Sequence, residues 1–359
     1  MLQNTKRLDN LDLMKTIAIL AVITLHTGLW EFSFGNKGFL LTDIVQYSFR
    51  ILSQGVPIFL MVNGFLLFRK KDLVIKKHYL KTLKLFFLFL FWTGFLYLLS
   101  EISHGNISSV SISGIVKAII TANSSNAVTW YLQNLIAVYL VFPMLKLIYD
   151  KEASLFRILF IIVLFFTAGL SIINLLAEFS NVFISNNVFD KIILFENFLK
   201  RFSPVGNGWF LLFFMLGGSI LLNYDNVKKR RVIYFFGGIV GVVAAVAFAL
   251  VMSYKQRYIY NVNFVYSSFL MPVILVGLWM VAEGYSSKDF LINKIITSIG
   301  KNTLGIYLTH WIFIYLLRCF FVPEMFWQRL LFYLIVLVCS YFFSLFLRII
   351  PGIRYFVTV

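Results

Sequence analysis

The stretch Val232–Ser253, VIYFFGGIVGVVAAVAFALVMS, contains no charged residue over its 22 positions. At 1.5 Å per residue, a helix of this length is about 33 Å long, close to the roughly 30 Å hydrocarbon core of a bilayer. The apolar residues follow one another without alternating with polar ones, which argues against a strand of a membrane β-barrel. The stretch therefore predicts a membrane-spanning α-helix.

Similar apolar runs recur along the whole chain. The composition agrees, because 60% of the residues are apolar, 18% aromatic and only 13% charged, whereas a soluble domain has about 25% charged residues. The first run carries Asp12 and Lys15 and has no small-residue cleavage site, so we expect a retained helix and not a signal peptide. The sequence predicts an all-α, polytopic membrane protein of about ten helices, a single domain over 1–359, with the other spans at 12–31, 44–68, 79–100, 129–149, 155–177, 206–223, 263–283, 303–321 and 327–347.

The basic residues indicate how these helices are oriented. If the N-terminus is cytoplasmic, the inner segments hold 21 of the 32 Lys and Arg residues and the outer segments hold nine, with Lys15 and Arg50 inside helices. Lys and Arg favour cytoplasmic loops, so this bias predicts that both ends of the chain are cytoplasmic. It also accounts for the net charge of +17 without a nucleic-acid partner.

The two longest outer loops contain segments of their own. Residues 112–122 and 192–202 place apolar and polar positions at helical spacing, which predicts two amphipathic helices at the membrane interface. His78 and His104 are expected in loops.

Ionisable residues inside an apolar span are costly, and the first helix has three of them. Lys15 and His26 are eleven residues apart, so they share one helix face at a separation of about 16 Å along the axis. Asp12 is three residues before Lys15, close enough for an ion pair. Lys15 can hold an anion such as a phosphate, and His26 can act as a general base. The alternative is that Asp12 and Lys15 lie at the interface and that His26 only links helices through hydrogen bonds.

Other spans also contain unusual polar residues. The second helix has Arg50 in its outer half and a helix-kinking Pro57. The ninth helix has His310 about seven residues from its start, and Trp130 opens the fourth helix at the outer side, where aromatic belt residues are common. Arg50, Trp130 and His310 are candidates for substrate contacts.

Several common functional motifs are missing from the sequence. It has no nucleotide-binding glycine loop, no Cys/His metal spacing and no Gly-x-Ser-x-Gly nucleophile elbow. We therefore expect no metal site and no permanently bound cofactor.

Five segments together resemble the membrane acyltransferase 3 family, which includes polysaccharide and peptidoglycan O-acetyltransferases. Residues 11–26 are similar to its Asp-x-x-Arg-x10-His first helix, and residues 55–65 to its Val-Pro-x-Phe-Phe-x-x-Ser-Gly-Phe segment. Residues 81–84 look like its Arg-x-x-Arg pair, and residues 129–132 match part of its His-Leu-Trp-Tyr-Leu region. Residues 298–310 resemble its Gly-x-x-Ser-x-x-Ile-Tyr-Leu-x-His element. The resemblance spans nearly the entire chain, and no SGNH esterase-like domain is expected beside it.

The resemblance implies an O-acyltransferase of the bacterial cytoplasmic membrane. It implies that His26 is the base and that Lys15, oriented by Asp12, faces the phosphates of cytoplasmic acyl-CoA together with Lys81 and Lys84. The acyl group, acetyl or similar, would pass to a hydroxyl of a cell-envelope glycan or exopolysaccharide, directly or through a separate acyl-acceptor protein. The chain departs from the family pattern with Lys in place of Arg at these three cationic positions, which keeps the charge but loses the bidentate fork.

The same features fit two other classes of protein. Buried charges and a kinked helix are also typical of a transporter or flippase for a glycan or a lipid-linked intermediate. A non-catalytic membrane subunit is the third class.

Overall fold

The computed structural model describes residues 9–30, 40–106, 110–121, 129–206, 208–256, 267–285 and 290–358. Throughout these ranges the regular structure is helical, so the predicted all-α class is confirmed. The helices are α1 (Asp9–Thr27), α2 (Leu40–Leu52), α3 (Gly55–Phe68), α4 (Ile75–Ser103), α5 (Ile112–Thr121), α6 (Thr129–Lys151), α7 (Ala153–Leu164), α8 (Leu170–Phe183), α9 (Asn186–Lys200), α10 (Trp209–Leu222), α11 (Tyr224–Lys229), α12 (Arg231–Gln256), α13 (Leu270–Glu283), α14 (Phe290–Arg318) and α15 (Phe326–Ile349).

Each predicted span coincides with helix in the described ranges. Seven helical segments are long and apolar enough to cross a membrane: α1, α2 with α3, α4, α6, α7 with α8, α12 and α15. The helices α10 and α13 are apolar but have only 14 residues each, and α14 has the length but carries several charged residues. The total of ten crossings and the cytoplasmic location of both ends stay predictions. The expected end of the first span at 31 and the start of the eighth at 263 lie outside the described residues.

Two long segments are interrupted where the sequence disfavours a regular helix. The second predicted span breaks between Leu52 and Gly55, just before Pro57, so it forms α2 and α3. Proline in the first turn of α3 needs no hydrogen-bond partner for its nitrogen, which allows a new helix to start there. Between α7 and α8 the chain forms a π-helical turn at Phe165–Gly169.

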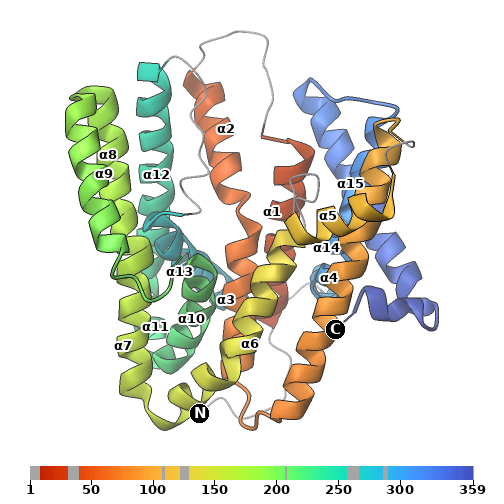
Figure 1. Ribbon diagram of the computed structural model, residues 1–359, viewed down its shortest axis with the longest axis horizontal. Coiled ribbons are helices and arrows are strands. Elements are labelled where there is room, and N and C mark those ends of the chain that lie inside the picture. Colours follow the sequence, from red (N-terminus) through yellow and green to blue (C-terminus); the bar gives the residue numbers. More distant parts are fainter. Residues whose placement is uncertain are drawn as a thin grey trace.

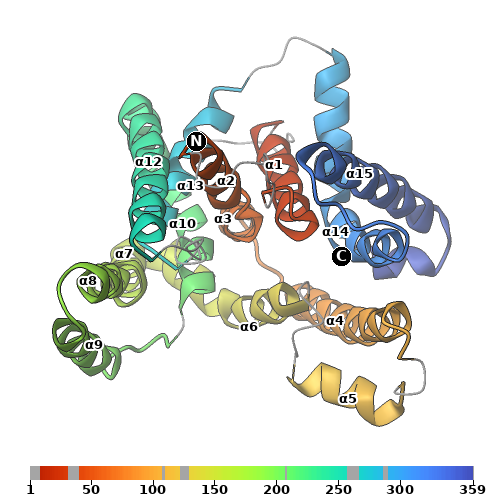
Figure 2. The same cartoon turned by 90° about the horizontal axis from the view of Figure 1, so that it is seen from above.

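The helix α3 forms the centre of the bundle and packs against α1 and α10. In Figure 2, α1, α3, α10 and α13 occupy the middle, with α14 and α15 on one side and α7, α8, α9 and α12 on the other. A β-carbon on Gly64 of α3 would lie 1.9 Å from the Phe214 carbonyl oxygen of α10, and one on Gly217 of α10 would lie 2.1 Å from the Met61 carbonyl oxygen. These two glycines therefore allow the backbones of α3 and α10 to touch, as small residues do between membrane helices.

The two amphipathic segments form helices, as predicted. They are α5 and α9, and both lie towards the periphery of the bundle (Figures 1 and 2). Their location at a membrane interface stays a prediction. His78, by contrast, was expected in a loop, and this was wrong: α4 begins at Ile75, and His78 is buried in its first turn. His78 donates from Nε2 to the Tyr139 carbonyl oxygen at 2.8 Å, which fixes α4 against α6.

Candidate functional site

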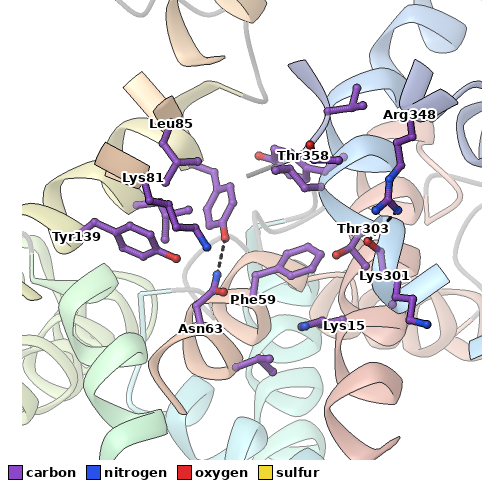
Figure 3. Close-up of a pocket in the computed structure, with 17 residues that line it drawn as sticks. Lys15, Phe59, Asn63, Lys81, Leu85, Tyr139, Lys301, Thr303, Arg348 and Thr358 are labelled. Carbon is purple, nitrogen blue, oxygen red and sulfur yellow. Dashed lines mark hydrogen bonds between the residues drawn. The ribbon is translucent and has the colours of Figure 1, made fainter. Parts of the chain in front are cut away.

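A cavity of about 380 Å³ opens between α1, α3, α4, α6, α14 and α15 (Figure 3). Four of the side chains that line it are cationic. Its wall consists of Lys15, Phe59, Val62, Asn63, Lys81, Leu85, Tyr131, Leu135, Tyr139, Gly300, Lys301, Thr303, Leu304, Tyr307, Arg348, Val357 and Thr358.

The four cations come from four different helices. Lys15 lies on α1, Lys81 on α4, Lys301 on α14 and Arg348 on α15. In Figure 3, Lys81 lies on one side of the cavity, with Lys301 and Arg348 on the other. Arg348 donates to the side-chain oxygen of Asn302, which directs its guanidinium group. No carboxylate belongs to the part of the wall that the structure describes, so the cavity favours a ligand with several negative charges.

The inner wall of the cavity is aromatic and polar. The Asn63 amide donates to the Tyr131 hydroxyl at 3.2 Å. The Tyr131 ring lies 5.2 Å from the Tyr307 ring, and the Phe59 ring is 6.2 Å from the Tyr131 ring and 6.3 Å from the Tyr307 ring. These contacts join α3, α6 and α14 at the inner end of the cavity.

A pair of histidines lies beyond this wall. The Tyr307 ring is 5.8 Å from the His310 ring, which is 5.4 Å from the His26 ring. The Trp311 ring packs 5.2 Å from His26. His310 is fully buried, and within the described residues neither of its ring nitrogens has a hydrogen-bond partner. A buried polar group without a partner is rare in native proteins, and a catalytic role is one of the reasons for which it is kept.

The packing of α1 against α14 brings these groups together. A β-carbon at Gly300 would lie 3.0 Å from the Asp12 β-carbon, so glycine permits α14 to approach the N-terminal end of α1 closely. Asp12 is buried there, one turn before Lys15. The face shared by Lys15 and His26 therefore points towards α14, with Lys15 in the cavity and His26 at the histidine pair.

The other candidate residues lie away from the cavity wall. The Arg50 guanidinium carbon is 3.8 Å from the centre of the Trp30 ring, in a cation–π contact. Trp130 packs edge-on against Phe210, with ring centres 5.6 Å apart. The Lys84 amine lies outside the cavity wall, 4.9 Å from the centre of the Tyr355 ring. A direct contact of these three residues with a substrate in the cavity stays a prediction.

Two of the four cavity cations were not predicted from the sequence. Lys301 and Arg348 were counted only as positive charges that orient helices, because each lies near a helix end in the linear sequence. Lys301 directly follows Gly300 in the segment 298–310, which resembles the family. This position in the sequence was the feature that could have indicated a functional role for Lys301. As for metals, among the described residues no group of three or more His, Cys, Asp or Glu side chains could hold an ion.

Comparison with known proteins gives one match. A family model described as "Acyltransferase domain" covers residues 8–349, which include all five resembling segments and both histidines. Searches of curated proteins and of solved structures gave no match. The matched range is almost the whole chain, and the chain therefore belongs to the membrane acyltransferase 3 family.

Proposed function

We propose that this membrane acyltransferase moves an acetyl or similar acyl group from cytoplasmic acyl-CoA to a hydroxyl of a cell-envelope glycan or exopolysaccharide. One observation carries the proposal: a cavity with four cations is joined by the Tyr307 ring to the pair formed by the fully buried His310 and the half-buried His26. In the orientation that the positive-inside bias predicts, the cationic end faces the cytoplasm of a bacterial cell, where acyl-CoA is available.

The cations suit the donor because coenzyme A carries several phosphate charges. Lys15, Lys81, Lys301 and Arg348 surround one space without a carboxylate among its described wall residues. Charge-assisted hydrogen bonds to phosphate are about twice as strong as neutral ones. With the phosphates held there, the flexible arm of the donor can extend along α1, where His26 lies about 16 Å from Lys15. The thioester then reaches the histidine pair.

His26 performs the chemistry in this proposal. One of its ring nitrogens takes the proton of the acceptor hydroxyl while the oxygen attacks the thioester carbonyl carbon. The carbon–sulfur bond breaks, and the coenzyme A thiolate takes the proton from the imidazolium. In the second route, a ring nitrogen of His26 attacks the thioester carbonyl, the carbon–sulfur bond breaks, and the coenzyme A thiolate leaves with a proton from the ring. The acceptor hydroxyl then attacks the acyl-imidazole, takes the acyl group and gives its proton to the ring. His310 lies close enough to orient His26 or the acceptor in either route.

The direct test is acyl transfer by the purified protein in liposomes with radiolabelled acetyl-CoA and an extract of envelope glycan. We expect label to appear in the glycan and coenzyme A to be released in equal amount. A well-folded sample that neither binds coenzyme A nor releases label would contradict the proposal and favour the transporter.

Donor binding gives a further prediction. Replacing Lys301 by glutamine is expected to raise the KM for acetyl-CoA about 10-fold with a much smaller change in kcat. The reason is that the charged hydrogen bond to the donor is lost equally from the bound substrate and from the transition state. Initial rates at varied acetyl-CoA concentration measure this. Lys294→Gln is the matched control, since Lys294 lies two turns earlier on α14 and does not line the cavity. If the two variants raised the KM equally, the KM would depend on the general surface charge and not on a contact between Lys301 and the donor.

A further inference from the structure

The helix α4 presents different residues to two sides of the protein. Lys81 and Leu85 line the cationic cavity. Leu80, Leu83 and Phe87 lie on the opposite side and are 57%, 49% and 60% exposed. Because residues three and four positions apart share a helix face, these three form one apolar surface, to which Lys84 also belongs.

Residues 351–358, which we call the strap, convert this surface into a groove. The strap follows α15 and turns at Gly352, whose φ of +86° is a left-handed conformation suited to glycine. Its Phe356 carbonyl oxygen accepts a hydrogen bond from the Trp92 indole of α4 at 2.8 Å, and its Phe356 ring lies 4.3 Å from that of Phe91. The groove between α4 and the strap has a volume of about 380 Å³ and is bounded on the strap by Tyr355 and Phe356.

Two cations flank one aromatic ring in this region. The Lys84 amine lies 4.9 Å and the Arg354 guanidinium carbon 5.1 Å from the centre of the Tyr355 ring. Arg354 also donates to the Tyr355 hydroxyl at 3.1 Å. Lys84 itself lines the groove, and among the described residues that bound the groove there is no carboxylate beside it. The groove thus combines an apolar floor with positive charge.

The position of α4 relative to a membrane explains why this combination matters. The helix has 29 residues, or about 44 Å, which exceeds the roughly 30 Å hydrocarbon core. Lys84 lies about 13 Å from its first residue, which follows the basic segment 69–71. Lys84 is therefore at the level of the cytoplasmic membrane boundary in the predicted orientation. Anionic phospholipid headgroups of that leaflet lie at the same level.

We infer that the groove binds one anionic phospholipid from the cytoplasmic leaflet. One acyl chain packs against Leu83, Phe87 and Phe356, and the headgroup phosphate lies between Lys84 and Arg354. This role differs from donor binding, because Lys84 lines the groove and does not belong to the cavity wall, although it lies only one turn from Lys81. A water-soluble phosphate compound would leave the exposed apolar floor uncovered, whereas a phospholipid satisfies both parts of the groove.

The bound lipid also supports the cavity. Val357 and Thr358, the next residues of the strap, form part of the cavity wall, and Val357 is only 2% exposed. A lipid that holds Tyr355 and Phe356 in place therefore steadies the wall beside the cationic cavity.

The experiment measures lipid retention and does not depend on acyl transfer. Wild-type protein and the double variant Lys84→Gln/Arg354→Gln are reconstituted in phosphatidylcholine nanodiscs with a small fraction of phosphatidylglycerol. Lipids retained after extraction are then counted by native mass spectrometry. We expect one phosphatidylglycerol on the wild type and a preference over phosphatidylcholine that is roughly 30-fold weaker in the double variant, since each basic residue near the surface contributes about a 5-fold preference.

Two further variants keep this test decisive. Lys76→Gln/Lys77→Gln removes the same charge from the exposed start of α4, outside the groove, and is expected to retain the lipid. Leu83→Trp fills the groove without a change of charge and is expected to lose it. If both charge variants weaken retention equally, or if Leu83→Trp retains the lipid like the wild type, the site is overturned and only diffuse surface attraction remains.

Discussion

Replacing His26 by alanine is expected to lower the rate of acyl transfer by roughly 100- to 10,000-fold, the range that a positioned general base contributes. The side chain lies at the end of the ring series Tyr131, Tyr307 and His310 that begins in the cationic cavity. The variant removes the imidazole but leaves the cations that would bind the donor. We therefore expect kcat to fall while coenzyme A still binds, as measured by label transfer and by equilibrium binding to the same sample.

His104→Ala is the matched control. His104 is exposed at the end of α4, does not line the cavity and hydrogen-bonds to the Ser100 carbonyl oxygen of its own helix. It should leave the rate within about 2-fold, as surface substitutions have small effects. Full activity of a well-folded His26→Ala variant would exclude His26 as the base. Rapid acid quenching separates the two routes: label bound covalently to wild type but not to the variant indicates an acyl-imidazole, and its absence indicates general-base catalysis.

Replacing Gly64 by alanine is expected to destabilise the protein strongly, with a fall in the thermal midpoint of at least about 5 °C in detergent. A β-carbon there would lie 1.9 Å from the Phe214 carbonyl oxygen, a backbone atom that cannot rotate away. The helices α3 and α10 must then separate, and forced overpacking of this kind costs about 1–3 kcal/mol or more. Because α3 also supplies Phe59 and Asn63 to the cavity, we expect donor binding to weaken as well.

The control for this prediction is a glycine whose replacement by alanine is expected to raise the stability of the protein and not to lower it. A β-carbon on Gly237 of α12 would meet only the Val273 side chain at 3.9 Å, so Gly237→Ala gains up to about 1 kcal/mol of helix propensity and should not lower the midpoint. Gly217→Ala should resemble Gly64→Ala, and the double variant should lose less than the sum of the two, since both glycines serve one contact. Additive losses would show that they act separately.

The sequence determined the class of this protein through the length and continuity of its apolar runs. Runs such as Val232–Ser253 can only be buried in a bilayer or a large core, and each predicted span coincides with helix in the described part of the chain. Local chemistry also predicted the amphipathic helices α5 and α9 and an irregularity at Pro57, where the expected kink is a break between α2 and α3. The order of the five resembling segments identified the family, which the match over 8–349 confirms.

Only the tertiary structure decided which residues meet. Helical periodicity placed Lys15 and His26 on one face of α1, since that depends on a single helix. It could not show that this face turns towards His310, 284 positions later in the chain, or that Lys301 and Arg348 complete the cavity with Lys81. It also could not show that Lys84, one turn after Lys81, lies against the strap and outside the cavity wall. Which helices are neighbours depends on close backbone contacts such as that of Gly64 with Phe214, and a single sequence does not reveal which positions so distant along the chain will touch.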